Sequence, residues 1–84
     1  FVNSAYPNPF NSKVTLSCNL RSPSRLSIYI SDITGRVVHA IEENQLLSGN
    51  VHYSVSAKNW VAGSYFVRYS TDETAIVQQL VHVK

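Results

Sequence analysis

The chain has few cysteines and charged residues, and it has no long apolar run. It contains one cysteine, Cys18, so no disulfide can form within it. Charged residues make up 14% of the sequence, against about 25% in an average domain. The seven basic residues are scattered, whereas a nucleic-acid-binding surface needs a clustered basic patch. No apolar run approaches the roughly 18 residues of a membrane span. We therefore expect no nucleic-acid partner and no transmembrane segment.

Catalytic and metal-binding patterns are also missing. Zinc sites usually contain closely spaced ligand pairs, but the histidines are far apart and are expected on solvent-facing positions: His39, His52 and His82. Glu42–Glu43 and Asp72–Glu73 are adjacent acidic pairs, and neighbours on a strand point to opposite faces. No G-x-S-x-G sequence offers a serine nucleophile. The sequence predicts a non-catalytic domain without a metal or another cofactor.

The sequence does contain a strong signal for β-strands. Five stretches alternate apolar and polar residues, which places one set on each face of a strand: 14–20, 26–30, 51–56, 64–70 and 75–84. In the first stretch Leu16 and Cys18 share the apolar face, so we expect both side chains to be buried.

Turn signals separate these stretches. Residues 21–25 contain Pro23, and a second loop is expected over 48–50. Asp32 can accept hydrogen bonds from backbone amides two residues on, and Gly35 can adopt a positive φ, which together predict a hairpin tip. The β-branched start of residues 36–42 favours a strand over a helix there. We expect an antiparallel β-sandwich of immunoglobulin-like type, with about seven short strands.

The aromatic residues divide between the predicted core and the surface. Three tyrosines fall on inward-facing positions: Tyr53, Tyr65 and Tyr69. Tyr29 lies opposite the apolar face of its strand, and Trp60 lies in the loop expected over 57–63. Exposed aromatic side chains can stack on sugars or anchor a protein partner. Tyr29 and Trp60 are therefore candidate ligand contacts, although Trp60 could instead cap the open end of the sandwich.

A stiff segment precedes the strands, with the sequence Tyr6-Pro7-Asn8-Pro9-Phe10-Asn11. Each proline fixes its own φ and disfavours helix at the residue before it, so an extended chain is expected. Tyr6 and Phe10 are four residues apart, and an extended chain directs both to the same side, where they would pin it to the sandwich. Prolines cannot donate ladder hydrogen bonds, so we expect an edge segment rather than a central strand.

Three motifs follow one another along the chain: Y-P-N-P-F at 6–10, D-x-x-G-R at 32–36 and A-G-x-Y-F at 62–66. Together with a β-rich stretch that ends at Lys84, they resemble the C-terminal sorting domain of the type nine (Por) secretion system. They are also similar to the related immunoglobulin-like domain of flagellar hook-capping proteins. The resemblance covers nearly the whole chain. The residues that carry it are Tyr6, Pro7, Asn8, Pro9, Phe10, Asp32, Gly35, Gly63, Tyr65 and Lys84.

The resemblance implies a β-sandwich at the C-terminus of a secreted enzyme or adhesin of a Gram-negative bacterium. Residues 1–5 would be the end of a linker from an upstream cargo domain, and residues 6–84 would be the sorting domain. Phe1 in place of methionine agrees with a piece of a longer chain. The implied role is to direct cargo from the periplasm to an outer-membrane translocon. A sortase then removes the domain, and the cargo is released or attached to the cell surface.

One position departs from the family pattern, and two other functions stay open. A lysine often precedes the final apolar stretch of such domains, whereas Gln78-Gln79 precede Leu80 here. The first alternative is a carbohydrate-binding accessory domain of a secreted hydrolase or adhesin, with Tyr29 and Trp60 as the contacts. The second is a structural immunoglobulin-like spacer.

Overall fold

The computed structural model describes residues 2–83. In this range the chain forms β1 (Val2–Tyr6), β2 (Lys13–Ser31), β3 (Val37–Ser56), β4 (Gly63–Ser70) and β5 (Ala75–His82). No helix among these residues is long and apolar enough to cross a membrane. All pairs between the five strands are antiparallel, which confirms the predicted all-β antiparallel fold. Its immunoglobulin-like type stays a prediction.

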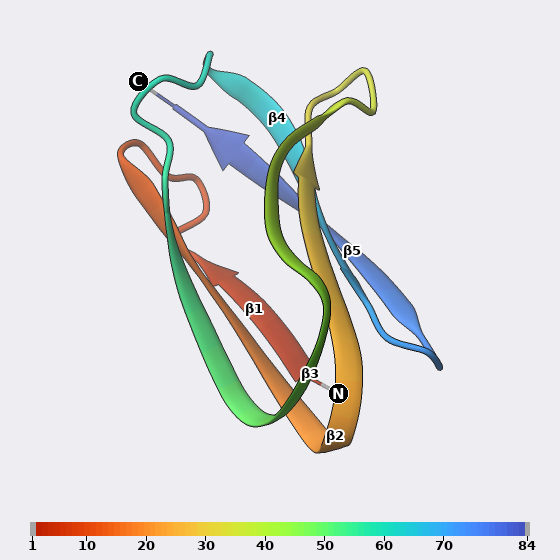
Figure 1. The fold of residues 1–84 in the computed structure, drawn as a ribbon. Coiled ribbons are helices and arrows are strands. Elements are labelled where there is room, and N and C mark those ends of the chain that lie inside the picture. The colour runs from red at the N-terminus through yellow and green to blue at the C-terminus, as the bar shows by residue number, and fades with distance from the viewer. Residues whose placement is uncertain (1, 84) are drawn as a thin grey trace.

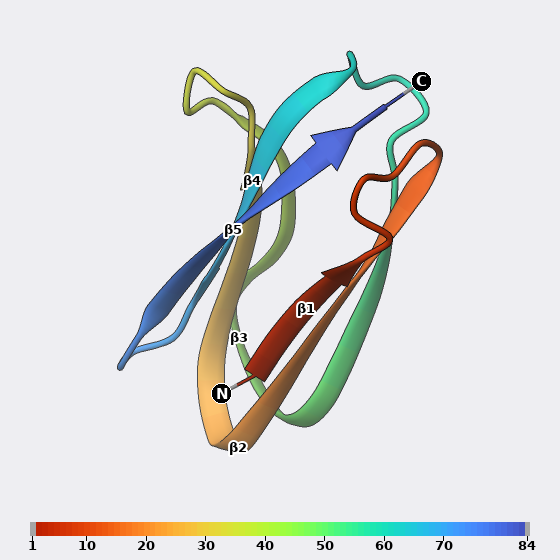
Figure 2. The same ribbon diagram turned by 180° about the vertical axis from the view of Figure 1, so that it is seen from behind.

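Strands β2 and β3 connect the two layers of the fold. They pair along most of their length, with a register shift in β2 between Leu20 and Ser24. Figures 1 and 2 show that β2 turns sharply there, so that its two halves lie in different layers. β1 pairs with the first half of β2, β4 pairs with the second half, and β5 pairs with β4. The sandwich is thus one sheet folded over on itself.

The structured part of the chain begins before Tyr6. Residues 1–5 were expected to be the end of a linker, but β1 pairs with β2 from Val2, opposite Asn19, to Tyr6, opposite Thr15. Residues 2–5 are therefore part of the sheet.

Two predicted loops lie inside strands, which is why the structure has five strands rather than about seven. Residues 21–25 belong to β2 and residues 48–50 to β3, because the two strands bend together instead of ending. The register shift leaves Pro23 outside the paired residues, so its missing N–H removes no ladder bond. Gly49 has a φ of 74° at the bend in β3, a conformation that glycine adopts without steric cost.

The alternating residues of the strands fill the space between the layers. Leu16, Leu26, Ile28, Val67, Tyr69 and Leu80 are fully buried there. Cys18 also lies in this core, as expected, with 3% of its surface exposed. Burial raises the pKa of the Cys18 thiol. The reactive thiolate is therefore disfavoured, and the side chain acts as a small apolar group.

Two tyrosines form hydrogen bonds between the layers. The Tyr69 hydroxyl in β4 donates to the Ser4 carbonyl in β1 at 3.4 Å. The Tyr53 hydroxyl donates to the Glu42 carboxylate at 2.6 Å, and these residues lie in opposite halves of β3. Burial, followed by the bond to Glu42, raises the pKa of Tyr53. Tyr53 therefore stays protonated and keeps the two halves of β3 together.

Replacing Leu16 with alanine should lower the free energy of unfolding by about 2–5 kcal/mol, because it opens a cavity at a fully buried position. Urea denaturation measures this change. Leu46 in β3 is 59% exposed and gives a matched control, for which Leu46→Ala should cost less than about 0.5 kcal/mol. A loss below about 1 kcal/mol for Leu16→Ala would contradict the register of β2.

Candidate functional site

The three sequence motifs meet at one end of the sandwich, which we call the motif end. It comprises residues 7–12, the β2–β3 tip at 32–36, the β3–β4 loop with the start of β4 at 57–66, and the final residues of β5. Figure 1 shows these segments toward the upper end of the sandwich, away from the β2–β3 bend and the start of β1. Each motif is visible in the sequence, but their meeting at one end of the sandwich is visible only in the fold.

The D-x-x-G-R motif forms the predicted hairpin tip. The Asp32 Oδ1 atom accepts hydrogen bonds from the Thr34 amide at 2.9 Å, the Thr34 hydroxyl at 2.6 Å and the Arg36 amide at 3.1 Å. The Oδ2 atom lies 3.4 Å from Arg36 Nε. Gly35 has a φ of 89° and donates its amide to the Asp32 carbonyl. The Thr34 hydroxyl, more than the backbone amides and the Arg36 charge, holds the pKa of Asp32 below its ordinary value.

The Y-P-N-P-F segment closes the free edge of β5. Its Tyr6–Pro7 and Asn8–Pro9 peptide bonds are cis. The Asn8 side chain takes the place of a neighbouring strand's backbone. Its Nδ2 donates to the Gln79 carbonyl and its Oδ1 accepts from the Val81 backbone amide, both at 3.0 Å. The Phe10 amide then donates to the Val81 carbonyl, and the Phe10 carbonyl accepts from the Val83 amide. The segment is therefore an edge segment, as expected from its prolines.

The predicted common direction of Tyr6 and Phe10 is wrong. Phe10 is 1% exposed, whereas Tyr6 is 52% exposed. The prediction assumed an extended chain, but residues 7–9 form bends, and a bend removes the even spacing that places two side chains on one side. Phe10 alone pins the segment to the core.

Four aromatic rings form the interior of the motif end. Phe10 stacks on His82 with a centroid distance of 5.0 Å, and Trp60 contacts Phe10 at 6.1 Å and Tyr65 at 4.8 Å. The predicted solvent-facing position of His82 is wrong, since it is 4% exposed. Its Nδ1 lies 3.3 Å from the Phe10 carbonyl and its Nε2 lies 3.2 Å from the Trp60 carbonyl. His82 shares the inward face of Leu80 two residues earlier, a signal that the sequence analysis missed.

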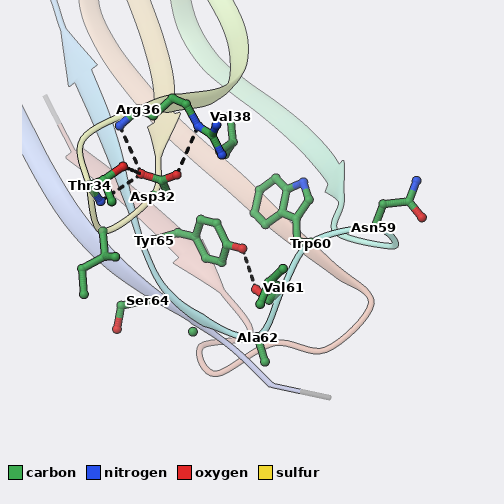
Figure 3. Close-up of a pocket in the computed structure, with 12 residues that line it drawn as sticks. Asp32, Thr34, Arg36, Val38, Asn59, Trp60, Val61, Ala62, Ser64 and Tyr65 are labelled. Carbon is green, nitrogen blue, oxygen red and sulfur yellow. Dashed lines mark hydrogen bonds and ion pairs between the residues drawn. The ribbon is translucent and has the colours of Figure 1, made fainter.

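A cavity of about 410 Å³ lies between the hairpin tip and the β3–β4 loop. Asp32, Arg36, Trp60, Gly63 and Tyr65 are among the residues that line it. Figure 3 shows the Tyr65 ring beside Trp60, with Asp32 and Arg36 close by. The Tyr65 hydroxyl donates to the Val61 carbonyl at 2.5 Å, which fixes the loop over the ring. Motif residues from two distant parts of the sequence therefore share one cavity.

The remaining predicted residues lie elsewhere. Tyr29 is half-buried on β2, between Ala40 and Arg68 on the neighbouring strands, and does not line the cavity. Gln79 donates its side-chain amide to the Ser64 hydroxyl at 3.1 Å. Lys84 lies outside the described residues. Among residues 2–83, no group of three or more histidine, cysteine, aspartate or glutamate side chains could hold a metal ion.

Comparison with known proteins agrees with the motifs. Residues 4–84 match the family of secretion system C-terminal sorting domains. The chain belongs to this family. No curated protein matches the chain. As a sorting domain it is a non-catalytic signal for type nine secretion, and this signal implies export of the protein to the cell surface or the medium.

The Asn8 side chain gives a test of the edge closure in this sorting domain. Asn8→Ala removes both bonds to β5 and should lower the free energy of unfolding by about 1–2 kcal/mol. It should also speed hydrogen exchange at the Val81 amide, which loses its acceptor. Asn59→Ala, at an exposed loop position, is the control and should change neither quantity. Unchanged exchange at Val81 in Asn8→Ala would show that Asn8 does not close this edge.

The Asp32 carboxylate should titrate at acidic pH with a midpoint below its ordinary value of 3.8. Its stabilising effect is then complete above the unfolded-state pKa and is lost as the pH falls through the lower folded-state pKa. Carboxyl chemical shifts in an NMR titration measure this midpoint. Thr34→Val removes the strongest donor and should move the midpoint upward. A wild-type midpoint at or above 3.8 would contradict the bonding at the tip.

Proposed function

We propose that this sorting domain delivers an upstream cargo domain to the outer-membrane translocon of the type nine system, and that the motif end is the surface the translocon recognises. One observation carries this proposal: residues from the three motifs, far apart in sequence, form one continuous structure. Phe10 contacts Trp60, and Trp60 lines the same cavity as Asp32, Arg36 and Tyr65. A translocon can therefore recognise the folded domain as a surface instead of a linear signal.

The position of β1 supports a division between cargo and signal. β1 starts near the β2–β3 bend, at the opposite end of the sandwich from the hairpin tip (Figure 2). A cargo domain joined before β1 would leave the motif end uncovered. The translocon then exports the cargo through the periplasm and outer membrane, and a sortase attaches it to the cell surface or releases it. Because Val2–Tyr6 is paired with β2, we place the sortase site upstream of this strand.

A reporter fusion tests the proposal. The 84-residue chain, fused to the C-terminus of a periplasmic reporter in a host with the type nine system, should export the reporter. Val61→Glu should reduce export at least about tenfold, because Val61 is 75% exposed at the motif end and a charge there disturbs a partner contact. Val77→Glu, at a 55% exposed position on β5, is the matched control.

Two outcomes would overturn the proposal. The first is retention of the wild-type fusion in the periplasm while an established sorting domain exports the same reporter. The second is equal export by the Val61→Glu and Val77→Glu fusions. Thermal unfolding of both variants should show that each is folded at the growth temperature.

A further inference from the structure

The cavity at the motif end is lined mainly by apolar groups. Ile33 at the hairpin tip is 77% exposed and Val61 in the facing loop is 75% exposed, and both line it. Val38, Ala62 and the Trp60 and Tyr65 rings also line it. Large aliphatic side chains at two neighbouring loop tips, around an aromatic floor, are typical of a protein contact rather than of a free surface.

Most of the side-chain oxygen atoms that line this cavity are already engaged within the domain. Both Asp32 oxygens contact Thr34 or Arg36, and the Tyr65 hydroxyl donates to the Val61 carbonyl. The Asn59 amide points away from the Tyr65 ring in Figure 3. A sugar ring needs several free hydrogen-bonding groups around an aromatic platform, so this arrangement favours a side chain of a protein over a saccharide.

The two cavities that Trp60 lines carry a net positive charge when they are taken together. Arg36 contacts Asp32 through Nε, but its side chain is 80% exposed, so the terminal amino groups face solvent. Trp60 also lines a second cavity of about 480 Å³, and Lys58 is among the residues that line that one. Asp32 is the one acidic residue that lines either cavity among residues 2–83, and its carboxylate is held by the tip. An acidic segment that spans the two cavities would meet Arg36 in one and Lys58 in the other.

We propose that the motif end binds an acidic peptide segment of its partner. A large apolar side chain of that segment enters the cavity between Ile33 and Val61. Carboxylates on either side of it contact Arg36 and Lys58. This inference rests on the proposed function, because it names the chemistry of the translocon segment that recognises the domain.

A binding experiment with a defined probe tests this inference. The probe is a fluorescein-labelled peptide with a central phenylalanine flanked by glutamates, measured by fluorescence anisotropy with the 84-residue chain. We expect saturable binding with a Kd below about 1 mM, and this binding should weaken as the salt concentration is raised. Arg36→Gln/Lys58→Gln should weaken binding at least about tenfold. Arg21→Gln/Arg68→Gln makes the same change of net charge away from the cavity and should leave binding within about twofold of wild type.

Control peptides separate the contributions. Replacing the phenylalanine with serine, or the glutamates with lysines, should each weaken binding at least about tenfold. The indole N–H signal of Trp60 should shift during an NMR titration with the original peptide. The single variant Lys58→Gln leaves the hairpin tip intact, so it tests the charge contribution even if the double variant does not fold. It should weaken binding about threefold or more.

Three results would overturn the inference: no binding of the acidic peptide, equal weakening by the two double variants, or binding of an acidic polysaccharide in place of the peptide. Its failure is distinguishable from failure of the proposed function. A wild-type chain that exports the reporter but does not bind the peptide would refute only the acidic-segment inference. A chain that binds the peptide but leaves the reporter in the periplasm would refute the proposed export role.

Discussion

The pairing of residues Asn8–Phe10 with strand β5 is the contact on which the motif end depends. Asn8 and Phe10 complete the hydrogen bonds of β5 between Gln79 and Val83, so this part of the edge is not left open. The same contact places the Phe10 ring under Trp60 and against His82. Full burial of a phenylalanine contributes about 1.5–3 kcal/mol. Trp60 in turn lies against Tyr65, whose hydroxyl fixes the loop beside the hairpin tip.

Much of the fold could be predicted from residue patterns, because each pattern reports a local constraint. In the alternation from Val14 to Leu20, the apolar residues fall on one face of β2, and the structure buries them: Val14, Leu16, Cys18 and Leu20. Asp32 and Gly35 specify the hairpin tip through short-range hydrogen bonds and a positive φ. These features depend on neighbouring residues, so a single sequence contains them.

Other features depend on contacts between distant residues and could not be found in this way. Pro23 suggested a loop, but pairing between β2 and β3 on both sides of the bend keeps both strands continuous. His82 was expected at the surface, although its aromatic partners Phe10 and Trp60 lie 72 and 22 residues away. The cavity likewise needs the tip at 32–36 and the loop at 57–62 to face each other. The sequence motifs were enough to indicate the family. The surface that these motifs form could be found only from the fold.

We propose that the translocon contacts the motif end of the folded domain. Site-specific photo-crosslinking in a secreting cell tests it most directly, with a photoreactive amino acid placed at Val61 or at Val77. Both are exposed valines, but Val61 lines the cavity and Val77 lies on β5 opposite Arg68. We expect a crosslink to a translocon component from position 61 and none, or far less, from position 77. Equal crosslinking from both positions, or crosslinking from position 77 alone, would contradict it.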